Sequence, residues 1–193
     1  MTGDREIEVK FRVTSFADLE RNLRGLGFRE VTPRTHEMNT LHDLPGESLR
    51  GRGELLRVRR YGDKWTFTHK SKAAAGTHKS RVETETAVAD GEKLARILGV
   101  LGFVPVFRYE KFRTEFSDGT GHVLLDETPI GNLAEIEGPH DWIDQTADKL
   151  GVARADYITD SYASLFFEWK RRTGSPAKEM TFEAVGRLKP TLP

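Results

Sequence analysis

The chain has 193 residues, a length within the range of one domain, and 37% of them are hydrophobic and 31% charged. Its 30 basic and 30 acidic residues give a formal net charge of zero, which argues against a nucleic acid or a membrane surface as its partner. No apolar run approaches the ~20 residues that span a bilayer, MTGDREIEV lacks a secretory signal pattern and cysteine is absent, so we expect a cytoplasmic protein.

The first predicted element is a strand with two chemically different faces. In EIEVKFRV (6–13) the charged residues Glu6, Glu8, Lys10 and Arg12 alternate strictly with apolar ones. Strict alternation indicates a β-strand, because successive side chains of a strand point to opposite faces. Folding requires only the apolar face, so the two acids and two bases on the other face need a separate explanation.

Two amphipathic helices are predicted at separate points of the chain. One begins near Ser15 and the other near Asp90, each with an N-cap residue at its start and a glycine at its end. Their ends, LRGLGFREV (23–31) and LGVLGFVPV (98–106), are alike. The similarity predicts a helix-turn-strand unit that occurs twice in a pseudo-symmetric domain, with each helix covering part of one sheet.

Further alternating segments predict a series of antiparallel strands. They are LLRVRRY (55–61), WTFTHKSK (65–72), RVETETAV (81–88), YEKFRTEF (109–116), HVLLDE (122–127) and LAEIEG (133–138). Turn signals at 51–54, 61–64, 117–121 and 129–132 predict hairpins and meanders. Helical segments are predicted at 141–152 and 160–172, and the chain turns polar after Gly174. We therefore predict one domain over residues 1–174 and a frayed tail over 175–193.

The charged positions of these strands share one face. The bases in phase are Lys10, Arg12, Arg57, Arg59, Lys70, Lys72, Arg81, Lys111 and Arg113. The acids in phase are Glu6, Glu8, Glu83, Glu85, Glu115, Asp126, Glu135 and Glu137. If helices cover the apolar faces, this charged face meets either bulk water on an open sheet or the lumen of a closed one. Charged pairs at i and i+2 on strand after strand favour the lumen, and the open, solvated sheet is the alternative.

The two signs of charge indicate what such a lumen would bind. Carboxylates suit hard divalent cations, here Mg²⁺ or Mn²⁺, whereas arginine and lysine suit phosphate oxygens. Charges crowded into a lumen are unfavourable unless they are paired or occupied by a ligand. A metal-bound polyphosphate requires both signs in one cavity, whereas a simple anion would require only the bases.

The motifs, taken in order, resemble those of the CYTH domain proteins, also called triphosphate tunnel metalloenzymes. Glu6, Glu8 and Lys10 match the E-x-E-x-K signature of that family, and NTLHDLPGESLRGRGELLRVRR is similar to its stretch from an aspartate-proline turn to paired arginines. HKSK, RVETE, EKFR and LLDETPIGNLAEIEG resemble its later strands, and SYASLFF its C-terminal helix. The resemblance covers residues 5–138 and implies an α+β fold: a closed eight-stranded antiparallel tunnel with helices packed on the outside.

The resemblance also implies roles for individual residues. The metal-binding carboxylates of the family correspond to Glu6, Glu8, Asp126, Glu135 and Glu137, to which the strand pattern adds Glu83 and Glu85. Its phosphate-binding bases correspond to Lys10, Arg57, Arg59, Lys70, Arg81, Lys111 and Arg113, to which the pattern adds Lys72. Leu41 and His42 replace residues that are aromatic in many members, and Ser71 and Lys72 replace a Gly-Pro pair. These departures concern the part of the substrate beyond its triphosphate.

Our main hypothesis is a metal-dependent phosphohydrolase that cleaves the terminal phosphoanhydride of a small-molecule triphosphate. Lys10 or Lys70 would orient the attacking water. One alternative is a class IV adenylyl cyclase, a branch of the same family, which would convert ATP to cyclic AMP and pyrophosphate. A second is a non-catalytic binder of polyphosphate or RNA 5′ ends, although eight carboxylates would repel such a polyanion without metals. The sequence leaves open whether the protein forms a homodimer.

Other motifs favour ordinary structural roles. GTHKS (76–80) lacks the spacing of a P-loop, and the six histidines lack metal-ligand spacing. Lys79 is predicted to be a solvated loop lysine, with contact to an entering substrate as the alternative. Trp142 and Trp169 are predicted to pack in the core or between helices.

Overall fold

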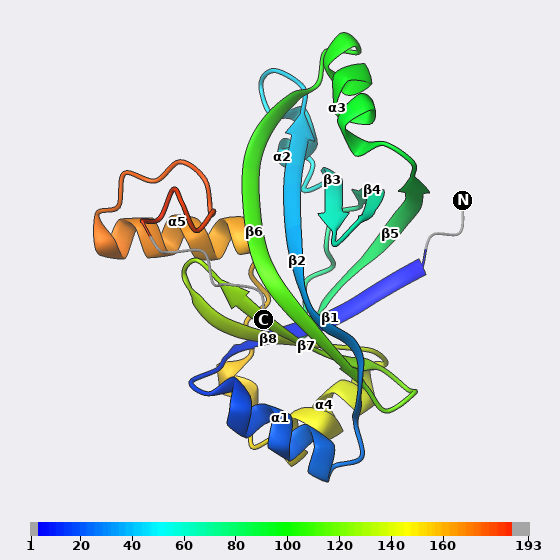
Figure 1. Ribbon diagram of the computed structural model, residues 1–193, viewed down its shortest axis with the longest axis vertical. Coiled ribbons are helices and arrows are strands. Elements are labelled where there is room, and N and C mark those ends of the chain that lie inside the picture. Colours follow the sequence, from blue (N-terminus) through cyan, green and yellow to red (C-terminus); the bar gives the residue numbers. More distant parts are fainter. Residues whose placement is uncertain (1–3, 187–193) are drawn as a thin grey trace.

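The computed structural model describes residues 4–186, which form a closed antiparallel barrel (Figure 1). The eight strands are β1 (Asp4–Arg12), β2 (Arg29–Asp43), β3 (Leu55–Tyr61), β4 (Lys64–Lys70), β5 (Lys79–Val88), β6 (Val104–Ser117), β7 (His122–Thr128) and β8 (Gly131–Glu137). Their order around the barrel is β1-β5-β4-β3-β2-β6-β7-β8, and β1 closes it by pairing with both β5 and β8. The predicted eight-stranded antiparallel tunnel is confirmed.

The hairpins lie where the turn signals predicted them. Strands β3 and β4 pair as far as Tyr61 opposite Lys64, β6 and β7 as far as Ser117 opposite His122, and β7 and β8 as far as Thr128 opposite Gly131. The strand β2 is longer than the sequence pattern indicated. It pairs with β3 on one side and with β6 on the other, and so joins the two halves of the barrel.

Helices cover the outside of the barrel. They are α1 (Phe16–Gly25), α2 (Ser48–Gly51), α3 (Gly91–Val100), α4 (His140–Lys149) and α5 (Tyr162–Thr173), with a short 3-10 helix at Arg154–Asp156. Helices α1 and α4 lie side by side at one end of the barrel (Figure 1). Leu23 of α1 and Ile143 of α4 are fully buried in one cluster with Val9 and Ile136 of the sheet. The apolar faces of the strands therefore point outward to the helices, and their charged faces point inward.

The two helix-turn-strand units end in the same way, as their sequences predicted. Gly27 and Gly102 adopt positive φ angles of 90° and 92°, a conformation that glycine tolerates best. In each unit the following phenylalanine returns a backbone hydrogen bond to the helix, from Phe28 to Leu23 O at 3.0 Å and from Phe103 to Leu98 O at 2.9 Å. The helices differ in packing, because α3 leaves Ile97 and neighbouring apolar side chains exposed.

The segment that follows α5 packs against the barrel. Met180 and Phe182 are almost completely buried, and the backbone of Met180 exchanges hydrogen bonds with Arg108 and Glu110 of β6. The expectation of a frayed tail directly after Gly174 is therefore wrong up to residue 186. The segment is polar in composition, but its apolar side chains Ala177, Met180 and Phe182 are buried. The rest of the predicted tail, 187–193, lies outside the described residues.

The closed barrel removes the charged face of the strands from bulk water. Glu8 and Lys10 of the opening strand are only 5% and 2% exposed. The alternative of an open, solvated sheet is therefore excluded. No helix within residues 4–186 is both long and apolar enough to span a membrane.

Candidate active site

The barrel encloses a cavity of about 510 Å³ with a charged wall to which every strand contributes. Nine bases line it: Arg5, Lys10, Arg57, Arg59, Lys70, Lys79, Arg81, Lys111 and Arg113. Seven acids line it: Glu6, Glu8, Glu83, Glu85, Glu115, Glu135 and Glu137. The wall thus has an excess of two bases.

Strand register places charged residues opposite one another across neighbouring strands. On β1, Glu8 is paired with Lys79 of β5 on one side and with Glu137 of β8 on the other. Two residues further along, Lys10 is paired with Glu135. Because all these positions are in phase, their side chains enter the lumen as adjacent groups.

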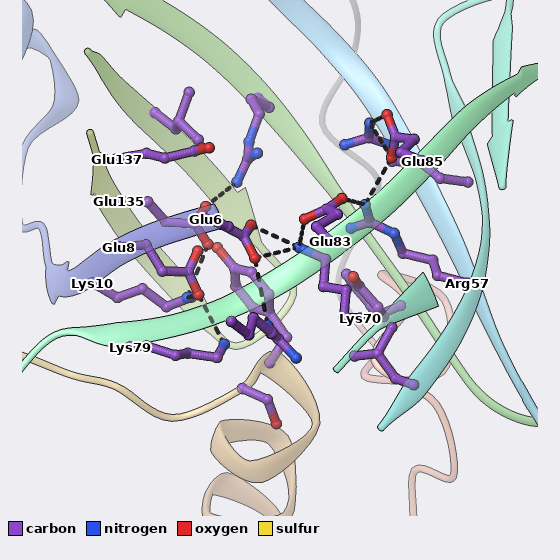
Figure 2. A pocket seen from close by; sticks show the side chains of 18 of the residues that line it. Glu6, Glu8, Lys10, Arg57, Lys70, Lys79, Glu83, Glu85, Glu135 and Glu137 are labelled. Carbon is purple, nitrogen blue, oxygen red and sulfur yellow. Dashed lines mark hydrogen bonds and ion pairs between the residues drawn. The ribbon is translucent and has the colours of Figure 1, made fainter. Parts of the chain in front are cut away.

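One oxygen of Glu8 receives two ammonium groups. Its Oε1 accepts hydrogen bonds from Lys10 Nζ at 2.7 Å and from Lys79 Nζ at 2.8 Å (Figure 2). Burial alone would raise the pKa of Glu8, but the charges of Lys10 and Lys79 outweigh it and hold that pKa below its usual range. Burial lowers the pKa of Lys79 to about 8, and the nearby charge of Lys10 acts in the same direction.

A second lysine links β4 to β1 and β5. The ammonium of Lys70 lies 2.6 Å from Glu6 Oε1 and 2.6 Å from Glu83 Oε2, and Figure 2 shows it between the two carboxylates. Arg81 approaches the other oxygen of Glu6 at 3.4 Å. The lysine is therefore held in place between two acids before any substrate enters.

The paired arginines of β3 meet the acids of β5. Arg59 donates to Glu85 Oε1 at 3.0 Å, and Arg57 lies 3.3 Å from Glu85 Oε2 and 3.6 Å from Glu83. Thr68 of β4 also donates to Glu85, at 2.6 Å. Each arginine thus shares its carboxylate partners with other groups, so a competing anion can take over part of its hydrogen bonding.

Asp126 lies behind the cavity wall rather than in it. Its side chain is fully buried and accepts two hydrogen bonds from Arg113, at 2.7 and 2.6 Å, and one from Lys111 at 3.0 Å. The hydroxyl of Tyr162, the first residue of α5, donates to the same carboxylate. Arg113 also reaches Glu135 at 2.6 Å, so Asp126 fixes a base that faces the cavity.

Glu137 differs from its neighbours because no ion pair or side-chain hydrogen bond within residues 4–186 involves its carboxylate. Burial, followed by the charges of Glu6, Glu135 and Glu8, raises its pKa to about 7. Four carboxylates from β1 and β8 therefore face one region of the cavity, and one of them lacks a cationic partner.

This carboxylate group matches the oxygen donors that hard divalent cations prefer. As the side chains lie in the described part of the chain, no three acidic, histidine or cysteine side chains are arranged to hold a metal ion. The lysines and arginines occupy most of the carboxylate oxygens, and phosphate oxygens are the natural competitors for those bases. The residues therefore fit Mg²⁺ or Mn²⁺ together with a phosphate ligand.

Thirteen of the fifteen predicted site residues line the cavity, and Lys72 and Asp126 do not. Strand β4 ends at Lys70, so the alternation that assigned Lys72 to the inner face no longer applies. The side chain of Lys72 is exposed and lies beside Gly53. The structure therefore does not bring Lys72 into the cavity wall, whereas Asp126 contacts two of the lining bases from behind.

The structure adds site residues that the sequence analysis missed. Lys79 is not a solvated loop lysine, because it is the first residue of β5 and is only 9% exposed. Its spacing from Arg81, Glu83 and Glu85 was the signal that could have placed it on the inner face. Glu37 of β2 is 1% exposed and lies 3.6 Å from Lys111, but HEMNTLH lacks an alternation that would have revealed it.

A family model for the CYTH domain matches residues 4–162. The chain belongs to the CYTH domain family. A candidate adenylate cyclase of Methanocaldococcus jannaschii is 26% identical to it over 171 residues, which cover 83% of this chain and 97% of that protein.

Two solved structures of similar fold agree with a CYTH barrel. The PH1012 protein of Pyrococcus horikoshii OT3 has a TM-score of 0.71 and 27% identity, and the match covers 83% of this chain and 98% of that one. A candidate adenylyl cyclase from Hippeastrum, described as having a dominant triphosphatase activity, has a TM-score of 0.59 and 18% identity, with 96% and 98% covered. The second likeness concerns the fold alone.

Proposed function

We propose that this CYTH protein is a divalent-metal-dependent hydrolase that cleaves the terminal phosphoanhydride of a small-molecule triphosphate inside the barrel. The observation that supports it is the cavity wall itself, which presents ranks of bases together with a cluster of carboxylates. The bases alone would suffice to hold an anion. The carboxylates require a cation that enters with that anion.

The charges of the wall support a metal-bound substrate over a bare polyanion. The wall has only two more bases than acids, an excess smaller than the charge of a fully ionised triphosphate. The carboxylates of Glu6, Glu8, Glu135 and Glu137 would hold a divalent ion as phosphate oxygens take over their lysine and arginine partners. When bound there, the ion supplies charge neutralisation and activation of water for in-line attack.

The bases of the chain would bind and orient the phosphates. Arg57 and Arg59 would provide planar donors to phosphate oxygens, and Lys70 and Lys111 would act as point charges. Burial would lower the pKa of Lys10, but the negative charges of Glu135 and Glu8 raise it above its usual range. The side chain therefore stays an ammonium. Lys10 would therefore act through its charge and its hydrogen bonds, not as a general base.

Adenylyl cyclisation is the second candidate, because the Methanocaldococcus jannaschii relative is named as a candidate adenylate cyclase. A cyclase must also hold adenine. Two tyrosine rings line the cavity, Tyr109 and Tyr162, whose centroids stack 5.6 Å apart, and Lys111 Nζ lies over the Tyr162 ring at 4.5 Å from its centroid. Both rings already make contacts within the protein, which favours hydrolysis of a compact triphosphate.

The deciding experiment measures products. The purified protein is incubated with inorganic triphosphate and with ATP, each with Mg²⁺ or Mn²⁺. Orthophosphate release supports the hydrolase, whereas cyclic AMP with pyrophosphate supports the cyclase. Tight binding in EDTA with no turnover after metal addition would instead support a non-catalytic binder.

A paired variant tests the metal assignment. Glu6→Gln combined with Glu8→Gln should abolish metal-dependent phosphate release, because both carboxylates face the cavity. Glu168→Gln, on the exposed face of α5, is the matched control and should retain activity. Full activity of the double variant would reject the assignment.

A further inference from the structure

An anchor outside the cavity fixes the chain just before Lys79. His78 ends the connection between β4 and β5, and its side chain is buried against α4. Its Nε2 lies 2.9 Å from Asp144 Oδ1. Because a carboxylate only accepts hydrogen bonds, this nitrogen carries the proton and donates it.

Asp144 is itself held in position. Arg154 donates to its Oδ2 at 2.6 Å, and the hydroxyl of Tyr157 donates to its Oδ1 at 3.1 Å. The ring of His140 packs edge-on against that of His78, with 4.8 Å between centroids. The imidazole of His78 is therefore set among groups from α4 and from the segment that follows it.

The connection is hydrogen-bonded to β5 at Ser71 and Ala74, and the part between Ala74 and His78 is exposed. Strand β5 starts immediately after His78. Successive side chains of a strand point to opposite faces, so a histidine fixed outside directs the next side chain inward. That next residue is Lys79, whose ammonium reaches Glu8 (Figure 2).

Glu8 already has one cationic partner besides the ammonium of Lys79. Lys10 donates to the same Glu8 oxygen and also lies 3.3 Å from Glu135. One ammonium is enough to neutralise one carboxylate. The second ammonium lines the cavity and can turn to an anion that enters it.

We propose that Lys79 binds a phosphate oxygen of the ligand in the cavity, and that His78 is the positioning residue that keeps Lys79 there. This inference rests on the proposed function, since it takes the ligand to be a triphosphate. It assigns a role to the connection between β4 and β5, which otherwise lies outside the site.

The first test measures binding, not turnover. Isothermal titration calorimetry with a non-hydrolysable, methylene-bridged triphosphate analogue and Mg²⁺ compares the wild type with Lys79→Met and Lys79→Arg. The methionine variant keeps the length of the side chain without its charge, and its affinity should fall by about tenfold or more, as for a lost charged hydrogen bond. The arginine variant should bind nearly as the wild type does. Equal binding by the methionine variant would overturn the proposal.

The second test asks whether His78 acts through Lys79. His78→Phe should weaken triphosphate binding about fivefold or more in the wild type and have no further effect in the Lys79→Met background, the pattern of two coupled residues. His78→Gln, which keeps an N–H group for Asp144, should restore binding. His69→Phe, at a half-buried position of β4, is the control. Equal losses in both backgrounds would show a general effect on the fold and would overturn the positioning role.

These outcomes separate the inference from the proposed function. If the wild type binds triphosphate without cleaving it, hydrolysis fails and the binding tests still decide the role of Lys79. If the wild type cleaves triphosphate and Lys79→Met neither weakens binding nor raises KM, the inference alone fails. Absence of triphosphate binding by the wild type would overturn both.

Discussion

Arg113 and Asp126 form a two-point ion pair inside the barrel, with Nε to Oδ1 at 2.7 Å and Nη2 to Oδ2 at 2.6 Å. The carboxylate is fully buried, and the guanidinium continues from it to Glu135 in the cavity wall. The burial of Arg113 would lower its pKa, but Asp126 and then Glu135 raise it well above the usual value. The pair thus places a permanently charged base in the wall of the cavity.

Asp126→Asn should destabilise the protein strongly. The substitution keeps the shape of the side chain but leaves the buried charges of Arg113 and Lys111 undercompensated, which costs about 3 kcal/mol of the free energy of unfolding. Urea denaturation measures this. Glu54→Gln, which removes the charge of the half-buried partner of the exposed Arg52, is the control and should leave the curve close to that of the wild type. Similar curves for the two variants would show that the buried pair contributes little.

Glu137→Gln should stabilise the metal-free protein in a pH-dependent way. The pKa of Glu137 is raised to about 7 in the folded state, so between its unfolded pKa and pH 7 the folded protein binds more protons and loses stability as the pH rises. The neutral amide removes that loss. In EDTA, the Tm of the variant should exceed that of the wild type at pH 8, corresponding to about 1–3 kcal/mol, and the difference should become much smaller at pH 5 and vanish below the unfolded pKa. A difference independent of pH would contradict the assignment.

Met180→Ala should destabilise the barrel although it lies beyond the last helix. The side chain is fully buried beside Phe166 and Leu165, so its truncation removes packing and leaves a void. A loss of about 2–4 kcal/mol is expected in thermal or urea unfolding. Lys178→Ala, at an exposed position of the same segment, should have almost no effect. A wild-type stability for Met180→Ala would mean that this segment detaches freely in solution.

Gly121→Ala and Gly99→Ala should have opposite effects. A Cβ at position 121 would lie 2.5 Å from the ring of Trp142 and 2.6 Å from the backbone oxygen of Glu137, so α4 or the β6–β7 turn must move, at about 1–3 kcal/mol. A Cβ at position 99, near the end of α3, would meet no atom within 4 Å, and alanine favours a helix over glycine by up to about 1 kcal/mol. Differential scanning calorimetry of both variants checks the pair. A stabilised Gly121→Ala would show that the contact with Trp142 adapts easily.

Much of the site could be predicted because alternation along one strand assigns side chains to a face. Glu6, Glu8 and Lys10 share the lumen in the structure as they share a phase in the sequence. The same argument was wrong for Lys72, because alternation does not reveal where a strand ends. It also missed Lys79, which was taken as part of a loop although it is in phase with Arg81.

The sequence by itself determined the two-faced strands, the shared phase of their charges and the resemblance to the family, since two-residue periodicity, turn residues and ordered motifs are local properties of the chain. Only the tertiary structure decided which charges meet. The register of β1 with β5 and β8 joins Lys79 to Glu8 and leaves Glu137 without a cation, and the packing of α5 brings Tyr162 to Asp126. Such pairings depend on how distant strands and helices align in space, which no local pattern specifies.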